Sequence, residues 1–191
     1  LEVPADVFTQ VHAAANPTLV AAVLALAPVS ADARVLDLYC GAGNFTLPLA
    51  RRAGHVLGIE RDPLAVAAAE ANGARTGLTR AAFRCAPVAA ALRDVPADSI
   101  DTAVITFTLC TIPDPASALA EVRRVLKPGG RMLFVEHTRS HQGLMAGVQD
   151  LLTPLWKQIG GGCHLNRPAV EMIREGGFEV PESQPVFLIR F

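Results

Sequence analysis

The sequence predicts an α/β fold with a doubly wound, mostly parallel sheet of about seven strands and helices on both faces. Short runs rich in Val, Ile and Leu alternate along the chain with longer helical patterns. The runs are apolar almost without interruption, which is typical of parallel strands buried on both faces. The predicted helices begin with the same capping pattern, an Asn or Asp followed by Pro at the first helical position.

Five strands are predicted from the apolar runs, at residues 34–39, 55–60, 80–84, 100–106 and 131–136. The tail predicts a closing pair of strands at 178–180 and 186–191. Together these make the sheet of about seven strands.

The capping pattern predicts helices at three places, after Asn16-Pro17 to about residue 27, after Asp62-Pro63 to Thr76 with Gly77 as the stop, and after Asp114-Pro115 to about residue 126. Asn166, with Pro168 two residues later, predicts a fourth helix that Gly176-Gly177 closes. The segment 138–163 breaks the alternation, so we expect an irregular insert there, where such folds often carry a lid.

Length and composition limit the other choices. The 191 residues favour one domain, with an N-terminal helical segment at 1–30 and the insert or lid at 138–165. A net charge of −1 argues against nucleic acid as a partner, and the longest apolar stretch, 11 residues at 19–29, is shorter than the roughly 20 that span a bilayer. Four scattered cysteines fit a reducing, cytoplasmic location, and the Arg and Ala bias suggests a bacterial source. Oligomeric state and any residues before Leu1 stay open.

The turn after the first strand carries the clearest chemical signal. Gly41 and Gly43 allow a sharp turn and close approach to a ligand, but Thr46 replaces the third glycine of a dinucleotide-binding turn. Glu60 ends the next strand, where a carboxylate can accept hydrogen bonds from both ribose hydroxyls. Asp37 would repel a pyrophosphate but can order the turn and meet an ammonium group. These residues predict S-adenosylmethionine, an adenosine cofactor that carries such a group.

The sequence resembles the class I S-adenosylmethionine-dependent methyltransferases, a Rossmann-like family. The resemblance rests on Asp37-Leu-Tyr-Cys-Gly-Ala-Gly-Asn44, on Glu60, and on Leu126-Lys-Pro-Gly-Gly-Arg131 before the fifth strand. It places the adenine beside Cys85 and Ala86, although the acid usual there is absent. The cofactor-binding residues that it implies are Asp37, Tyr39, Gly41, Ala42, Gly43, Asn44, Glu60, Arg61, Cys85, Ala86 and Thr106.

The two halves resemble different branches of that family. Phe8-Thr-Gln10 and residues 37–49 are similar to RNA uracil-5-methyltransferases. Residues 100–178 are similar to the small-molecule type 11 branch, and within it to the methyltransferase-like thiol S-methyltransferases. That similarity rests on Thr108-Leu-Cys-Thr-Ile-Pro-Asp114, Phe134-Val-Glu-His137 and Gly161-Gly-Cys-His-Leu-Asn-Arg167. The Ser-Cys-Asn and Asp-Pro-Pro-Arg strings that the uracil enzymes need do not occur in the sequence.

Three residues are candidates for catalysis. His137 ends a predicted core strand, where an imidazole could promote ionisation of an acceptor thiol or simply hold the following loop. His12 lies on an N-terminal segment that could fold over the cofactor, or on the surface of a helix. Cys110 follows a strand, where a nucleophile could be placed, but the sequence shows no partner base, and small cysteines also pack in cores.

Residues near the end of the insert could line an acceptor pocket: Cys163, His164, Asn166 and Arg167. Asn166 is better explained as a helix cap, and Trp156 as a packing anchor for the insert. Cys110, Cys163 and His164 raise the question of a metal, but no ligand spacing repeats, so we expect none.

The function predicted is an S-adenosylmethionine-dependent methyltransferase acting on a small, apolar acceptor, with a thiol as first choice. Two alternatives stay open at this point. One is an RNA uracil-5-type methyltransferase, and the other is a catalytically silent module that binds the cofactor.

Overall fold

A computed structural model describes residues 1–3, 14–27 and 29–181. The chain divides into two compact units. The first comprises Leu1–Ile105 with Arg124–Leu133, and the second comprises Thr106–Arg123 with Phe134–Phe191 as far as these residues are described. Among the described helices, none has both the length and the apolar character needed to cross a membrane.

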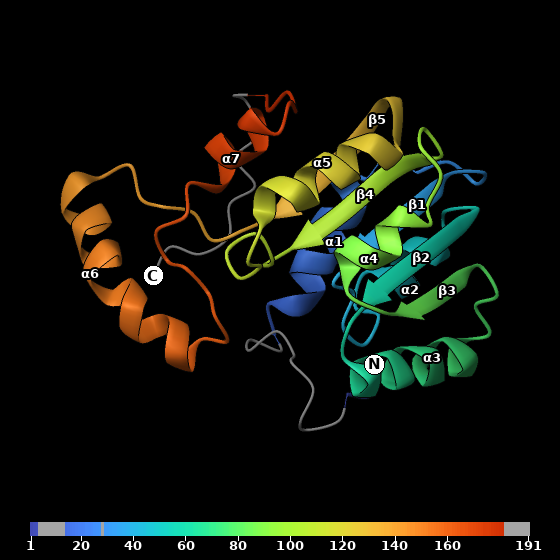
Figure 1. Ribbon diagram of the computed structural model, residues 1–191. Helices are drawn as coiled ribbons and strands as arrows, with labels where there is room; N and C mark the ends of the chain where they lie inside the picture. Colours follow the sequence, from blue (N-terminus) through green and yellow to red (C-terminus); the bar gives the residue numbers. More distant parts are fainter. Residues whose placement is uncertain (4–13, 28, 182–191) are drawn as a thin grey trace. The chain divides into compact units, whose positions relative to one another are not determined.

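The sheet confirms the predicted α/β class (Figure 1). Its strands lie in the order β3-β2-β1-β4-β5, with β1 parallel to both β2 and β4 and β2 parallel to β3. The strands are β1 (Arg34–Leu38), β2 (His55–Glu60), β3 (Ala81–Cys85), β4 (Ile100–Thr106) and β5 (Leu126–Val135). Because the chain leaves β1 for β2 and later returns to β4 on its other side, the carboxyl end of β1 is the switch point of the sheet, where ligands bind in such folds.

The prediction of about seven strands is wrong for the described residues, in which the sheet has five. Residues 178–180 form no strand, and 186–191 lie outside the described residues. Without a closing pair, β5 stays at the edge and is only partly buried, as is β3 at the other edge. β5 also begins at Leu126, earlier than predicted, where Lys127 Nζ donates to Asp101 Oδ1 at 2.6 Å beside the start of β4.

The helices are α1 (Asn16–Leu26), α2 (Thr46–Ala50), α3 (Pro63–Thr76), α4 (Val88–Arg93), α5 (Pro115–Val125), α6 (Gly143–Ile159) and α7 (Ala169–Glu175). Two predicted caps are confirmed. Asp62 Oδ1 accepts from Leu64 N at 3.0 Å with Gly77 left-handed at the other end of α3, and Asp114 Oδ1 accepts from Ser117 N at 3.0 Å.

The other two predicted caps are wrong. Asn16 is already helical, and its side chain exchanges hydrogen bonds of 2.9 Å with the amide of Asn44. Asn166 donates to Asp150 Oδ1 at 2.9 Å instead of capping α7. In both places the asparagine side chain forms a hydrogen bond with a residue distant in sequence, so it does not cap the helix as the local pattern predicts.

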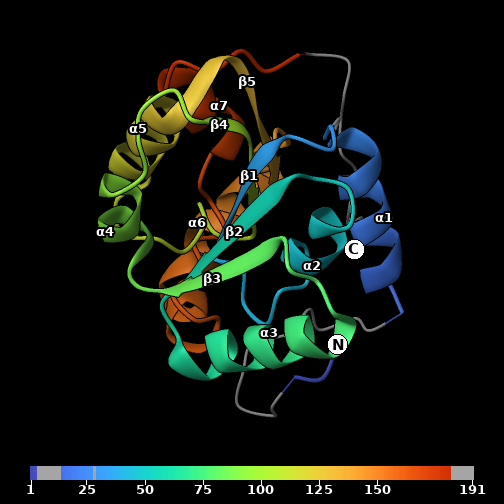
Figure 2. The ribbon, with the colours of Figure 1, turned by 90° about the vertical axis from the view of Figure 1, so that its right-hand side faces the viewer.

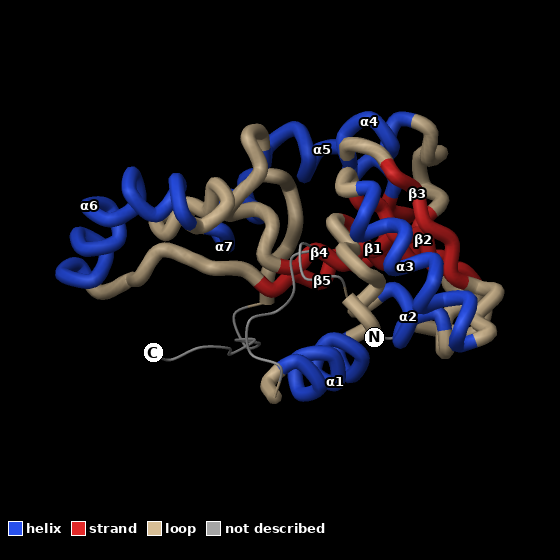
Figure 3. The backbone as a smooth tube through the Cα atoms, turned by 90° about the horizontal axis from the view of Figure 1, so that it is seen from below, coloured by secondary structure: helices blue, strands red, loops and turns tan. Residues whose placement is uncertain are grey.

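The expected irregular insert is also wrong, because most of it is the 17-residue helix α6 (Figure 3). Its apolar side chains recur at helical spacing, for example at Leu144, Val148, Leu151 and Leu155, and they are exposed. Pro154 lies inside this helix. The proline and the flanking glycines argue against a helix in the sequence, although the apolar residues recur at helical spacing.

Within the first unit, Figure 2 shows α1 and α2 on one face of the sheet and α4 on the other. The core lies between these layers, and β1 is buried along its whole length after Arg34. The largest fully buried side chains of this core include Leu36 and Leu38 of β1 and Val56 and Ile59 of β2. This packing fixes the ends of β1 and β2, from which the glycine turn and Glu60 project.

Candidate functional site

The turn between β1 and α2 has an unusual backbone. Tyr39, Gly41 and Gly43 have φ values of 61°, 52° and 86°, in the left-handed region that favours glycine. For Tyr39 this conformation costs roughly 1–2 kcal/mol, which the surroundings must offset. The N–H groups of Tyr39 and Cys40 both donate to Ile59 O, at 2.8 and 3.1 Å. The turn is therefore fastened to the end of β2.

Asp37 lies beneath this turn and is 1% exposed, so the alternative of a solvated turn acid is wrong. Its Oδ2 accepts a 2.5 Å hydrogen bond from the Thr46 hydroxyl at the start of α2. Burial raises the pKa of Asp37 to about 7, and the negative charge of Glu60 adds to this, while the hydrogen bonds of Thr46 oppose it. Asp37 orders the turn, as predicted, and its charge is poorly compensated by the protein alone.

Glu60 is held in one orientation by backbone donors. Its Oε1 accepts from the N–H of Arg61 at 2.7 Å and of Asp62 at 3.1 Å, and its Oε2 accepts from Gly41 N at 3.3 Å. A carboxylate has about four acceptor positions, so capacity remains for a ligand hydroxyl. Glu60 is only half-buried. A Cβ built on Gly41 meets no atom within 4 Å, so the turn backbone beside Glu60 faces open space.

The predicted adenine-side residues gather at the same strand ends. Cys85 is the register partner of Glu60, and its thiol lies 3.7 Å from Arg61 O. Ala86 N donates to Glu60 O at 2.9 Å. Thr106, the other predicted cofactor residue, belongs to the second unit, where its carbonyl accepts from the Thr108 hydroxyl. Glu60, Arg61, Cys85 and Ala86 thus lie together at the carboxyl ends of β2 and β3, and their role in binding adenosine stays a prediction.

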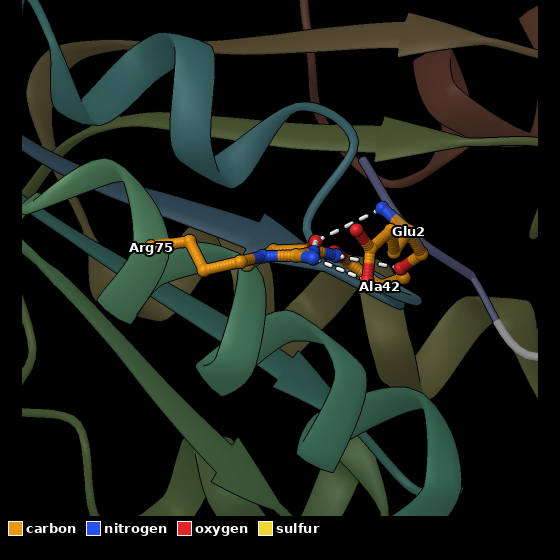
Figure 4. A network of polar contacts seen from close by, with 4 residues as sticks. Glu2, Ala42 and Arg75 are labelled. Carbon is orange, nitrogen blue, oxygen red and sulfur yellow. Dashed lines mark hydrogen bonds and ion pairs between the residues drawn. The ribbon is translucent and has the colours of Figure 1, made fainter.

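Sequence reasoning missed Asn72, which supports the turn from α3. Figure 4 shows Glu2 and Arg75 in the same network, beside Ala42 of the turn. The Nδ2 of Asn72 donates to Ala42 O at 3.3 Å and to Glu2 O at 3.0 Å, while its Oδ1 accepts from Glu2 N and from Arg75. Arg75 also forms an ion pair with Glu2. The available signal was an amide in an otherwise small and apolar buried stripe of α3, because a buried polar side chain needs partners.

A second cluster lies within the second unit and contains two of the predicted residues. The ligand atoms of Cys110, His137 and Cys163 all lie within 4.8 Å of one another, and Cys163 Sγ is 3.6 Å from His137 Nδ1. Both cysteines are buried and His137 is exposed, with its ring 5.2 Å from that of Phe107. Cys110 and Cys163 thus come together from segments 53 residues apart in sequence.

The three groups perturb one another. Contact with Cys110 lowers the pKa of Cys163 to about 7, and Trp156 lowers it further, against the effect of burial. Contact with Cys163 and burial raise the pKa of Cys110 to about 12. The pKa of His137 is raised, chiefly by Cys110. Cys110 is therefore a protonated thiol in the protein alone, which argues against a free thiolate nucleophile at that position.

The loop that carries Cys110 is fixed from both sides. Glu136 accepts from the N–H groups of Thr108, Leu109 and Cys110, at 2.6, 2.8 and 3.4 Å. Arg167 donates to the carbonyls of Leu109 and Ile112 at 2.6 and 2.7 Å. Burial raises the pKa of Glu136 to about 7. Glu136 was missed by sequence reasoning, although an acid at the end of a core strand was the signal used for Glu60.

Three predicted residues remain: His164, Trp156 and His12. His164 holds the loop, because its backbone N–H donates to Cys110 O at 2.8 Å and its Nδ1 lies 3.0 Å from the same oxygen. Trp156 is partly exposed on α6. His12 lies outside the described residues, and its role stays a prediction.

A family model described as a methyltransferase domain matches residues 29–176. The chain belongs to this family. The class I, S-adenosylmethionine-dependent methyltransferase predicted from the sequence is confirmed at this level, and S-adenosylmethionine is the cofactor of the family.

Solved structures agree on the fold. A putative methyltransferase from Bacillus halodurans, 20% identical, matches with a TM-score of 0.75 over 86% of this chain and 71% of its own. The [4+2]-cyclase SpnF, 27% identical, matches with 0.72 over 86% and 58%.

Curated methyltransferases match parts of the chain. Thiol S-methyltransferase TMT1B of Rattus norvegicus is 42% identical over 88 residues, which is 46% of this chain and 36% of the relative. The 23S rRNA (uracil(1939)-C(5))-methyltransferase RlmD of Acidithiobacillus ferrooxidans is 42% identical over 163 residues, 76% of this chain and 36% of the relative. The chain thus spans about a third of the length of these relatives.

Proposed function

We propose that this methyltransferase domain transfers the methyl group of S-adenosylmethionine to the thiol of a small, apolar acceptor. The observation that carries the proposal is the pairing of an exposed imidazole, His137, with two buried thiols in one fixed cluster. The 88-residue match to a protein named thiol S-methyltransferase supports the same acceptor class. In this proposal the glycine turn and Glu60 bind the donor.

The donor residues are those of the glycine turn and its neighbours. Glu60 accepts hydrogen bonds from ribose hydroxyls in the capacity that its backbone donors leave free. Asp37 provides a buried negative charge whose ionised form a nearby cation stabilises. Tyr39, Gly41, Ala42, Gly43 and Asn44 shape the turn, and Arg61, Cys85 and Ala86 lie at the adenine end, with Thr106 assigned to the same ligand.

When bound, the cofactor supplies an activated methyl group, so the protein mainly has to align the acceptor and exclude water. The acceptor thiol would release its proton to water, and its sulfur would then bond to the methyl carbon as the bond from that carbon to the donor sulfonium breaks. His137 assists by stabilising the acceptor as thiolate. The exposed apolar side chains of α6, which follows His137 in the chain, suit an apolar acceptor. His12 remains a lesser candidate for a catalytic role, and the raised pKa of Cys110 speaks against this residue as a nucleophile.

The test is methyl transfer from a labelled donor to small apolar thiols, with bulk tRNA and rRNA assayed in parallel. Thiol methylation with little RNA labelling supports the proposal. His137→Ala should lower turnover by roughly 10²–10⁴, the usual range for a positioned polar group, without weakening binding of S-adenosylhomocysteine. An unchanged turnover in His137→Ala removes this residue from the mechanism.

RNA uracil methylation is the second candidate because the RlmD match covers 76% of the chain. The uracil enzymes require a cysteine nucleophile in a Ser-Cys-Asn setting, and that string is absent from this sequence. The net charge of −1 also gives no general attraction to phosphates. RNA labelling without thiol methylation would reverse our ranking.

A third outcome would indicate a domain that binds the cofactor but methylates neither thiols nor RNA. A domain of this fold is found in a protein named a cyclase, so the fold does not fix the reaction. Tight cofactor binding with no methyl transfer to any acceptor would favour that assignment.

A further inference from the structure

We propose that Cys110, His137 and Cys163 form a binding site for a zinc-class divalent metal ion, with one coordination position left for an exogenous ligand. The sequence suggests Cys110, Cys163 and His164 as ligands but predicts no metal, because no ligand spacing repeats. In the structure His137, not His164, completes the cluster with the two cysteines. The fold nevertheless brings one ligand atom of each within 4.8 Å of the others.

The distance between Cys163 and His137 matches one edge of a zinc tetrahedron. Zn–S bonds of about 2.3 Å and Zn–N bonds of about 2.0–2.1 Å at tetrahedral angles place sulfur and nitrogen about 3.6 Å apart. The distance from Cys163 Sγ to His137 Nδ1 is 3.6 Å. Two sulfurs on such an ion lie about 3.8 Å apart, within the 4.8 Å limit that the cluster satisfies.

The donor set is the second argument. Two thiolates and one imidazole are ligands typical of zinc, and two thiolates cancel the charge of a divalent ion in a buried place. Carboxylate-binding ions such as magnesium or calcium do not favour such ligands. The cluster therefore selects a soft or borderline cation.

The two cysteines are held by backbone hydrogen bonds before any ion arrives. The backbone of Cys110 is bonded at both ends, with its N–H donating to Glu136 and its carbonyl accepting from His164 N. Cys163 N donates to Gly160 O at 3.1 Å. These bonds fix the backbone of both cysteines, so less conformational freedom is lost when an ion binds.

Three protein ligands leave a fourth position free. The two cysteines are buried and His137 is exposed, so solvent reaches the cluster at His137. Sites with three ligands and an open position are typical of catalytic zinc, whereas structural sites use four.

The open position connects the site to the acceptor, and this step alone rests on the proposed function, with His137 then acting on the acceptor as a ligand of the ion and not directly. An acceptor thiol bound there releases its proton to water and stays a thiolate on the metal. Its sulfur then forms a bond to the methyl carbon as the bond from that carbon to the donor sulfonium breaks. The products are a neutral thioether, a weaker ligand that leaves, and S-adenosylhomocysteine.

The test uses the full chain, freed of metal and kept under a reductant. Titration with Co²⁺ should give one equivalent bound, with the visible bands of tetrahedral cobalt and a thiolate charge-transfer band. Zn²⁺ should abolish both. Cys110→Ser, Cys163→Ser and His137→Gln should each weaken binding by roughly 100-fold or more. His137→Gln changes an exposed side chain, so it keeps the test valid if the cysteine variants fail to fold.

Matched controls remove the same groups elsewhere. Cys85→Ser removes an exposed thiol and His55→Gln an exposed imidazole, both in the first unit, and both should keep the full cobalt signal. The proposal is overturned if the folded, reduced protein binds no Co²⁺, or if binding is unchanged in His137→Gln. Calorimetry with S-adenosylhomocysteine on the same samples tests the proposed function separately, since neither metal readout depends on the cofactor.

Discussion

Replacing Asp37 by Asn should change how the stability of the protein depends on pH. Burial raises the pKa of Asp37 from 3.8 to about 7, so between these pH values the folded protein keeps a proton that the unfolded chain has lost. This bound proton contributes to the free energy of unfolding. Its contribution is fully present below about pH 4 and is lost as pH rises toward 7. Across the whole window the loss is roughly 4 kcal/mol, since each pKa unit is worth about 1.36 kcal/mol.

The assay is urea unfolding of the wild type and Asp37→Asn at several pH values between 5 and 8. Glu136 also has a raised pKa and adds to the wild-type slope, so the difference between the two proteins is the informative quantity. That difference should change by roughly 3 kcal/mol over this range, with the wild type losing stability relative to the variant as pH rises. Asn preserves the shape of the side chain and can still accept from the Thr46 hydroxyl. Parallel pH profiles for the two proteins would refute the assignment of a raised pKa to Asp37.

The structure makes further predictions for glycine and arginine. Gly58→Ala should lower the free energy of unfolding by about 1–3 kcal/mol and weaken cofactor binding, because its Cβ would lie 2.9 Å from Thr46 Oγ1, which orders the turn. Gly147→Ala, where a Cβ meets no neighbour, should instead raise stability by up to about 1 kcal/mol, and urea unfolding compares the two. Arg167→Met should lower thermal stability and, if the cluster binds metal, reduce Co²⁺ affinity by about 10–100-fold, since Arg167 holds two carbonyls of the loop that carries Cys110. An Arg167→Met protein with unchanged melting temperature and cobalt affinity would contradict this role.

Local rules predicted well those elements whose signals lie next to one another in the sequence. The caps at Asp62 and Asp114, the strands β1, β2 and β4, and the turn from Asp37 to Asn44 each depend on residues adjacent in sequence. The sites where prediction failed depend on distant partners. Asn16 pairs with Asn44 and Asn166 with Asp150, so neither amide is available as a cap.

The two clusters show the same limit. Glu60 was found because a strand end fixes its position, whereas the meeting of Cys110 with His137 and Cys163 requires the path of the chain through α6. No spacing in the sequence encodes that path. Asn72 and Glu136 had usable signals, a buried polar group in an apolar stripe and an acid at a strand end, and both support loops at the candidate sites.

Calorimetric titration with S-adenosylhomocysteine tests most directly the claim that this chain holds its methyl donor at the turn beside Glu60. We expect roughly micromolar binding by the wild type. Glu60→Ala should weaken it by at least about 10-fold, because a hydrogen bond to a charged group is worth about 1.5–3 kcal/mol. Glu70→Ala, which removes an exposed acid from α3, should leave the affinity unchanged. Absence of binding to the folded wild type, or equal affinities for the wild type and Glu60→Ala, would contradict the account.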